Sequence, residues 1–321
     1  MTTTPLVSVF IPTFNQVAFV AESLRSALDQ DYDNLEVVVS DDGSTDGTVS
    51  VIEDYARRFP GRLVALTNQP HLGLTPNCNR TLRACRGKYI AFGAGDDLFL
   101  PGKIRRQVEW LEQDANRVMC GHDVEAFESE TGHTIYRWSK MYPPGRFKDL
   151  AAIVRHGCPY GGVSVMVRKN ALPASGYDER VHIVSDWKLW IDLISAGGTY
   201  GYIDGVYARY RRHSSNITDI VVPHFEDALR MLDLVEEEHP ELARHCNYRR
   251  GVLELSLARW DFQQRNIKVA RQHLRRSLRV RPMAWLPWVL LGVSLLPVTS
   301  IEAMRRARRF ISAVRRPASR A

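Results

Sequence analysis

Residues 89–97 read YIAFGAGDD, a short apolar run followed at once by small residues and two adjacent carboxylates, Asp96 and Asp97. The apolar run is typical of a buried strand, and ligands of open α/β sheets bind at the carboxyl ends of the strands. Small residues beside the acidic pair leave room for a hydrated divalent cation, which takes carboxylate and phosphate oxygens together. The stretch therefore favours a site for a nucleoside diphosphate. The alternative is a turn before Pro101 and the next helix.

The residues before this stretch alternate between strand and helix patterns. β-branched, apolar runs are joined by short links to segments with apolar residues at helical spacing. This order predicts a parallel sheet covered by helices on both faces. The second strand also ends in an acidic pair, Asp41 and Asp42, so both acidic clusters are expected at one edge of the sheet. The expected strands are residues 7–11, 35–39, 62–66 and 88–92, and the expected helices are residues 17–28, 47–58 and 74–86.

Four pieces of sequence, in order, resemble family 2 of the inverting glycosyltransferases. The resemblance spans about residues 5 to 215 and implies the GT-A fold, a Rossmann-like α/β fold that binds nucleotide-sugars. The implied activity is transfer of a sugar from a nucleoside-diphosphate sugar to an acceptor hydroxyl. The pieces are VSVFIPTFN (residues 7–15), EVVVSDDGSTDGT (residues 36–48), the spaced residues Asn68, Gly73, Asn77 and Asn79, and GKYIAF (residues 87–92) running into Asp96, Asp97 and Leu98.

The resemblance also implies roles for individual residues. Asp97 would bind a divalent cation, Mn²⁺ or Mg²⁺, which assists departure of the diphosphate. Asp42 would accept a hydrogen bond from the base, and an acceptor-only carboxylate suits the imide N–H of a UDP- or dTDP-sugar. Many relatives have a further Asp where this chain has Ala94, so a lower metal affinity is an open alternative. The implied donor-binding residues are Pro12, Thr13, Asn15, Asp42, Asn79 and Asp96, and the implied metal ligands are Asp97 and His213.

The catalytic base is expected at Asp186. An inverting transfer needs a base within hydrogen-bond reach of the acceptor hydroxyl, and residues 184–190 (VSDWKLW) resemble the family's acidic pair at the start of an aromatic helix. Ser185 stands where the first carboxylate of that pair is usual, whereas Asp186 keeps the residue that the family uses. The alternative is that Asp186 only caps the helix that carries Trp187 and Trp190.

Two further segments belong to the resemblance. Residues 161–168 read as a strand after a flexible Gly pair, in a region that lies under the acceptor in the family. Residues 207–216 resemble the closing strand and its basic end, where His213 could ligate the metal or the diphosphate; a solvated loop His is the alternative. Arg211 and Arg212 could pair with phosphate, although such a charge run is usually a solvated face.

Other classes of protein lack their motifs here. No G-x-G-x-x-G follows the first strand, and the chain has no P-loop and no G-x-S-x-G, which argues against a dinucleotide oxidoreductase, a P-loop ATPase and an α/β-hydrolase. The five cysteines show no C-x-x-C spacing, as expected of reduced thiols. Two alternatives keep this fold or a related one: a non-catalytic nucleotide-sugar-binding scaffold, and a nucleotidyltransferase that would release pyrophosphate.

Positive charge is concentrated in the C-terminal part. Residues 249–321 hold 17 Lys and Arg against 3 Asp and Glu, a net charge of +14 that leaves −7 of the whole-chain +7 for residues 1–248. Residues 283–298 are apolar but fall short of the about 20 residues that a spanning helix needs. Trp285, Trp288 and the arginines after them favour an in-plane or re-entrant anchor on the membrane. The alternatives are a core helix and nucleic-acid binding, but no nucleic-acid motif accompanies the charge.

These observations together predict an enzyme of cell-surface polysaccharide synthesis with a lipid-linked glycan as acceptor. No signal peptide is expected at residues 1–6, so the protein should be cytoplasmic and peripherally associated with the inner membrane, without a nucleic-acid partner. The expected parts are a glycosyltransferase domain at 1–220 (nucleotide-sugar half 1–115, acceptor half 116–220), an α-helical extension at 221–282, and an apolar segment with a basic tail at 283–321.

Overall fold

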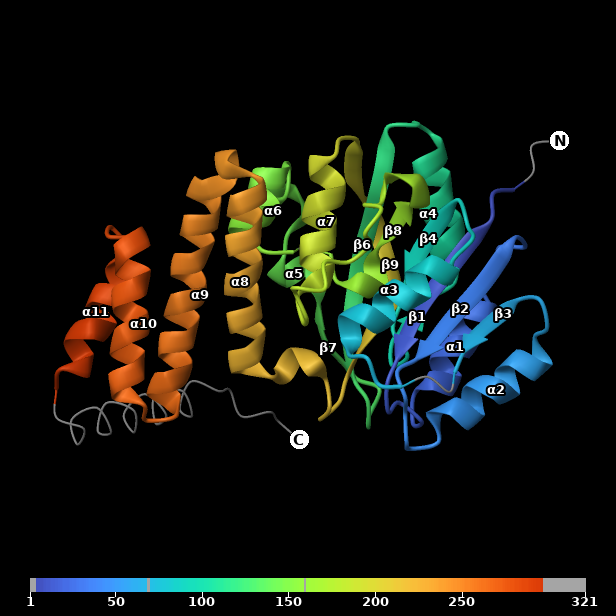
Figure 1. Cartoon of the computed structure of the whole chain (residues 1–321), viewed down its shortest axis with the longest axis horizontal. Coiled ribbons are helices and arrows are strands. Elements are labelled where there is room, and N and C mark those ends of the chain that lie inside the picture. Colours follow the sequence, from blue (N-terminus) through green and yellow to red (C-terminus); the bar gives the residue numbers. More distant parts are fainter. Residues whose placement is uncertain (1–3, 68–69, 159, 297–321) are drawn as a thin grey trace, which may run out of the picture. The chain divides into compact units, whose positions relative to one another are not determined.

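The computed structural model describes residues 4–67, 70–158 and 160–296 of the chain. It divides into two compact units, Met1–Leu242 and Ala243–Ala321. The first unit contains the sheet and the helices up to Glu238, and the second contains the helices from Ala243 onward (Figure 1). All residues with an expected role in donor binding, metal binding or catalysis lie in the first unit.

The strands of the described residues form one nine-stranded sheet in the order β3-β2-β1-β4-β8-β6-β9-β5, with β7 paired to β6. The four strands β1 to β4 run parallel to one another, and β9 is parallel to β6, whereas β8 is antiparallel to both β4 and β6. The mostly parallel sheet is therefore confirmed. The strands are β1 Val7–Thr13, β2 Leu35–Asp41, β3 Leu63–Leu66, β4 Tyr89–Phe92, β5 Leu98–Phe99, β6 Arg117–Glu128, β7 Thr134–Arg137, β8 Met166–Arg168 and β9 Thr199–Arg212.

Helices cover both faces of this sheet, as the alternating pattern predicts. The apolar residues of α1 (Val20–Leu28), α2 (Thr48–Arg58) and α4 (Lys103–Glu112) pack on one face in a single core cluster. The opposite face carries an aromatic cluster in which Trp190 meets Phe92 edge to face at 4.9 Å between ring centroids. The remaining helices of the first unit are α3 Leu74–Ala84, α5 Trp138–Met141, α6 Leu150–His156, α7 Ser185–Ser195 and α8 Val221–Glu238.

Two of the expected elements are clearly shorter in the structure, and the others described here differ by one or two residues at an end. The helix expected from residue 17 begins at Val20, because Asp46 accepts the N–H of Val17 and holds the preceding residues in a turn. The strand expected over residues 161–168 is only Met166–Arg168, preceded by a 3₁₀ turn at Gly162–Ser164. This difference comes from tertiary packing, which the hydrophobic periodicity of the sequence does not reveal. A Cβ at Gly161 would lie 2.8 Å from the Trp138 ring, so the backbone of Gly161 packs closely against Trp138.

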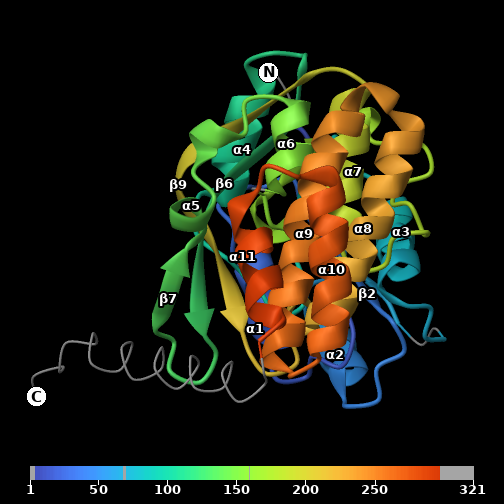
Figure 2. The same cartoon turned by 90° about the vertical axis from the view of Figure 1, so that its left-hand side faces the viewer.

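The second unit is a helical hairpin with a third helix. Its helices are α9 Ala243–Gln263, α10 Ile267–Val280 and α11 Trp285–Ser294, and α9 and α10 lie side by side (Figure 2). Ala258, Phe262, Ala270 and Leu274 form their shared core. The C-terminal helical extension is thus confirmed. Within the described part of the chain, none of the helices combines the length and apolarity needed to cross a membrane.

Candidate active site

Three chain segments meet around the end of β1. The register pairs Thr13 with Asp41 on one side and Phe10 with Phe92 on the other, so both acidic pairs leave the sheet at the same edge. The loops are tied to β1 by backbone hydrogen bonds, from Asp42 N to Thr13 O at 3.0 Å and from Gly95 N to Pro12 O at 3.3 Å. The structure therefore brings the predicted residues Pro12, Thr13 and Asp42 to the loop that bears Asp96 and Asp97.

Gly95 permits this close approach. A Cβ added at Gly95 would lie 2.6 Å from Thr13 Oγ1, and Thr13 Oγ1 itself donates to Gln16 Oε1 at 2.7 Å. Only a residue without a side chain fits between the two loops. Gly95 thus serves close backbone packing at the end of β1.

His213 and the acidic pair come together at this edge. His213 Nε2 lies 3.0 Å from Asp96 Oδ2, and the ring also packs against Phe19 in a tilted pair, at 4.5 Å between centroids. Both side chains are largely buried, with 9% of His213 and 13% of Asp96 exposed. The solvated-loop alternative for His213 is therefore wrong, because its ring packs inside the site from the end of β9.

For Arg211 the solvated-face alternative is wrong, and pairing with phosphate stays a prediction. Its side chain is 6% exposed and donates through Nε to the carbonyl of Asp96 at 2.8 Å and through Nη2 to Glu22 Oε2 at 2.5 Å. Its backbone N–H donates to Asp97 Oδ1 at 3.0 Å. Strand alternation places Arg211 inward while Arg212 pairs with Asp219 near the surface. This inward side of the strand is the signal that sequence reasoning left unused.

The Asp97 carboxylate is short of compensating charge. Its side chain is buried, and burial together with the neighbouring Asp96 raises the pKa of Asp97 well above the usual range. The backbone N–H and the guanidinium of Arg211 act in the opposite direction and offset only part of this effect. A buried carboxylate in this state favours a cation beside it.

The carboxylate of Asp42, which is predicted to bind the base, already accepts hydrogen bonds from the chain itself. Its Oδ1 accepts from Leu72 N at 2.8 Å and its Oδ2 from Gly73 N at 2.9 Å, while His71 Nδ1 lies 3.0 Å from Oδ2. A carboxylate oxygen can accept two hydrogen bonds, so Oδ1 can still accept a second one. The contact of Asp42 with a base stays a prediction. His71 also packs against Phe14 in a tilted ring pair, which borders this end of the site.

Asn15 and Asn79 have different surroundings. Asn15 adopts a left-handed backbone (φ 51°) and holds the loop after β2, since its Oδ1 accepts from Thr45 N at 3.0 Å. Asn79 is buried, and its side chain hydrogen-bonds to the loop before α7, donating to Tyr177 O and Glu179 Oε1 and accepting from Tyr177 N. The structure thus places Asn79 as a link between α3 and that loop, and donor contact by Asn79 stays a prediction.

Asp186 lies in the first turn of α7. Its Oδ1 accepts from Trp187 N at 2.7 Å, and burial raises the pKa of Asp186 to about 6. The carboxylates of both Asp186 and Asp42 act on the buried Cys78 thiol and raise its pKa, after burial itself. Both carboxylates are therefore near enough to Cys78, on α3, to oppose the charge of its thiolate.

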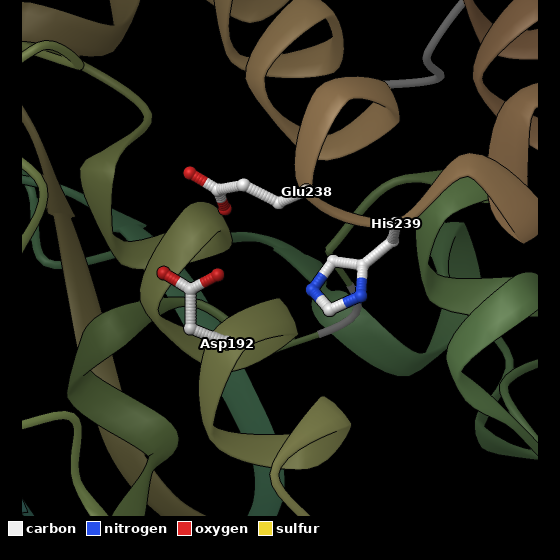
Figure 3. A group of neighbouring side chains, drawn as sticks. All are labelled: Asp192, Glu238 and His239. Atoms are coloured by element: carbon white, nitrogen blue, oxygen red, sulfur yellow. The ribbon is translucent and has the colours of Figure 1, made fainter.

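A second cluster of potential ligands lies apart from these residues. Among the residues that the structure describes, only Asp192, Glu238 and His239 bring three potential metal-binding side chains within 4.8 Å of one another (Figure 3). The buried ammonium of Lys188 lies 2.6 Å from both carboxylates. Burial opposes the charge on Lys188, but hydrogen bonds to Asp192 and Glu238 raise its pKa. A lysine thus already supplies the positive charge here, so we assign no metal to this cluster.

The sequence of this chain is similar to that of known proteins. Residues 8–172 match the family model described as glycosyl transferase family 2. The putative glycosyltransferase EpsE of Bacillus subtilis is 31% identical over 204 residues, which cover 61% of this chain and 69% of that protein.

Two solved structures share the fold. S. aureus TarS residues 1–349 in complex with UDP-GlcNAc superpose with a TM-score of 0.63 at 16% identity, covering 87% of this chain and 84% of that one. The mannosyltransferase PcManGT of Pyrobaculum calidifontis, in complex with GDP-Man and Mn²⁺, gives a TM-score of 0.61 at 18% identity and covers 100% of this chain and 89% of that one.

Proposed function

The chain belongs to glycosyltransferase family 2, and from this we propose that it transfers a sugar from a UDP- or dTDP-linked donor to an acceptor hydroxyl with inversion. The observation that carries the proposal is the assembly at the end of β1, where Asp42, the Asp96–Asp97 pair and His213 converge. Diphosphate, ribose and base each need a polar partner, and this edge offers one for each. The proposed catalytic part is residues 1–220.

The residues at this edge fit a divalent cation. Asp97 is a buried carboxylate whose charge is incompletely offset, and Asp96 and His213 add oxygen and nitrogen ligands 3.0 Å apart. Imidazole suits Mn²⁺ better than Mg²⁺, which prefers oxygen ligands. Asp97 and His213 would hold the ion, and the ion would neutralise charge that develops on the leaving diphosphate.

The proposed mechanism is a single displacement with Asp186 as base. Its carboxylate takes the proton of the acceptor hydroxyl as that oxygen bonds to the anomeric carbon, and the bond from this carbon to the β-phosphate oxygen breaks. The nucleoside diphosphate leaves on the opposite face. The raised pKa of Asp186, about 6, matches a base that works near neutral pH.

The acceptor is proposed to be a lipid-linked glycan of a cell-surface polysaccharide, reached at the membrane surface. The support is the exposure of side chains at α11. Trp285 is 71% exposed, Trp288 is 55% exposed, and Met283, just before the helix, is 95% exposed. Exposed Trp side chains favour the headgroup region. The arginines expected to meet anionic lipid follow in the sequence at residues 305–316, outside the described residues.

The function is tested with purified protein, a panel of UDP-, dTDP- and GDP-sugars, Mn²⁺ or Mg²⁺, and acceptor glycolipids. Release of nucleoside diphosphate that depends on both donor and acceptor supports the proposal. A scaffold would bind a nucleotide-sugar without acceptor-dependent release, and a nucleotidyltransferase would release pyrophosphate. The stereochemistry of the product distinguishes inversion from retention.

A further inference from the structure

Asp227, on helix α8, accepts backbone N–H groups from three consecutive residues of another segment. His182 N lies 3.1 and 3.0 Å from its two carboxylate oxygens, and Ile183 N and Val184 N lie 2.6 and 3.0 Å from Oδ2. The Asp227 side chain is buried, whereas the adjacent Glu226 is exposed. A buried carboxylate with this many N–H donors is strongly oriented.

These N–H groups precede the helix that carries the proposed base. Helix α7 begins at Ser185, and its N-cap residue Val184 provides no side-chain cap. Asp227, which lies more than 40 residues further along the chain, accepts these N–H groups in place of such a cap. It lies at the N-terminus of α7, where the helix dipole favours a negative charge. Asp186 follows Val184 by two residues, so whatever fixes Val184 also fixes the base.

The same segment is held from its other side by α3. Thr75 Oγ1 donates to the carbonyls of Val181 and His182 at 2.8 and 3.2 Å. The carbonyls of this segment thus point to α3 and the following N–H groups point to α8, which runs beside α7 (Figures 1 and 2). Asp227 therefore completes a clamp on the chain that leads into Asp186.

We propose that Asp227 is a positioning residue for the glycosyl transfer, which fixes the start of α7 and thereby the orientation of Asp186. The inference rests on the proposed function, because it requires Asp186 to be the base. It gives the part of the chain that follows the family match a role in catalysis. Since misplacing a reacting group by about 1 Å can cost about 100-fold in rate, loss of the clamp lowers turnover with donor binding unchanged.

A purely structural role for Asp227 would give a different result. Helix α8 is also attached at its far end, where Glu238 pairs with Lys188 at 2.6 Å and with Arg180 at 2.8 Å. Attachment of α8 therefore does not depend on Asp227 alone. This second anchor allows the start of α7 to loosen while the unit stays folded.

The first measurement is amide hydrogen exchange of the full chain, with Asp227→Asn as the variant and Glu226→Gln as the control with the same change of charge. Asn keeps the size of the side chain but replaces one accepting oxygen by a donor. We expect exchange at residues 182–184 to accelerate about tenfold or more in Asp227→Asn, and to stay unchanged in Glu226→Gln. Equal exchange in the two variants would overturn the clamp.

The second measurement is steady-state kinetics with donor and acceptor. For Asp227→Asn we expect a kcat that is about 10- to 100-fold lower, with the KM for the donor and the thermal shift by nucleoside diphosphate and Mn²⁺ unchanged. A wild-type kcat in Asp227→Asn overturns the inference. A parallel loss of kcat and nucleotide binding also overturns it, and so does failure of Asp227→Asn to fold while Glu226→Gln folds. Normal turnover of Asp186→Asn would instead show that Asp186 is not the base, which is the assignment on which the inference about Asp227 rests.

Discussion

The backbone N–H of Arg211 donates to Asp97 Oδ1 at 3.0 Å, and this hydrogen bond joins β9 to the acidic pair that follows β4. The guanidinium of the same residue donates to the carbonyl of Asp96, and His213 two residues later meets the Asp96 carboxylate. The end of β9 thus shapes the site from a point 114 residues away in the chain. The proposed metal ligands depend on a tertiary contact.

The first prediction concerns the Arg211 side chain. Arg211→Lys keeps the charge but cannot reach both the Asp96 carbonyl and Glu22, so we expect a loss of about 1–3 kcal/mol in the free energy of unfolding and about tenfold weaker nucleotide binding. Arg212→Lys is the control, because Arg212 pairs with Asp219 nearer the surface and such pairs contribute about 0–1 kcal/mol. Denaturant unfolding and nucleotide titration check both; equal effects of the two variants would refute the prediction.

The second prediction concerns Asp97. Asp97→Asn can still accept from Arg211 N, but it lacks the charge that would hold a cation, so the thermal shift produced by nucleoside diphosphate with Mn²⁺ should disappear. The pKa of Asp97 is raised in the folded protein, so the folded state binds this proton more tightly than the unfolded state. Wild-type stability without metal therefore falls as pH rises above the ordinary aspartate pKa, and this part of the pH dependence should vanish in Asp97→Asn. A persistent metal-dependent shift would remove Asp97 from the ligands.

The sequence predicts the parallel half of the fold well because local signals set it. Apolar runs and helical spacing locate the first four strands and three helices, and the two acidic pairs mark where the parallel strands end. It fails where tertiary packing decides. Gly161 looks flexible in sequence but packs against Trp138, and Arg211 looks solvated but turns inward.

The contacts of individual site residues were equally hidden. Asn79 belongs to the resemblance, yet its hydrogen bonds run to Tyr177 and Glu179, almost 100 residues away. Asp227 has no motif at all, and only the folded chain shows its N–H partners at residues 182–184. Long-range hydrogen bonds of this kind leave no periodic trace in a single sequence.

The third prediction concerns the exposed face of α11. The double variant Trp285→Ala, Trp288→Ala should bind anionic lipid vesicles about tenfold more weakly. Both Trp side chains are exposed, and each substitution removes an indole ring that favours the membrane–water interface. Leu253→Ala, in the same unit, is the control because it changes a buried residue. Co-sedimentation with vesicles of anionic and neutral lipid measures the effect. Equal sedimentation of the double variant and the wild type would exclude α11 as the anchor.

The last prediction is a pH dependence set by Asp186. Only the ionised carboxylate can take the acceptor proton, and burial raises the pKa of Asp186 to about 6, so kcat/KM should fall as pH drops below about 6 and level off above it. Asp186→Asn should lower kcat about 100- to 10,000-fold and leave nucleotide binding intact.

The stability of the protein should respond to Asp186 with the opposite sign. Because the folded pKa exceeds the ordinary aspartate value of 3.8, ionising Asp186 costs stability as pH rises from about 4 to about 6. At pH 7.5, Asp186→Asn should therefore melt at a higher temperature than the wild type, and its unfolding free energy should be about 3 kcal/mol larger. The two proteins should converge near pH 4. Thermal scans across this range measure the difference. An Asn variant that stays inactive but shows no such pH-dependent gain would mean that Asp186 is not buried as a charge, and its pKa would no longer explain the acid limb of the rate profile.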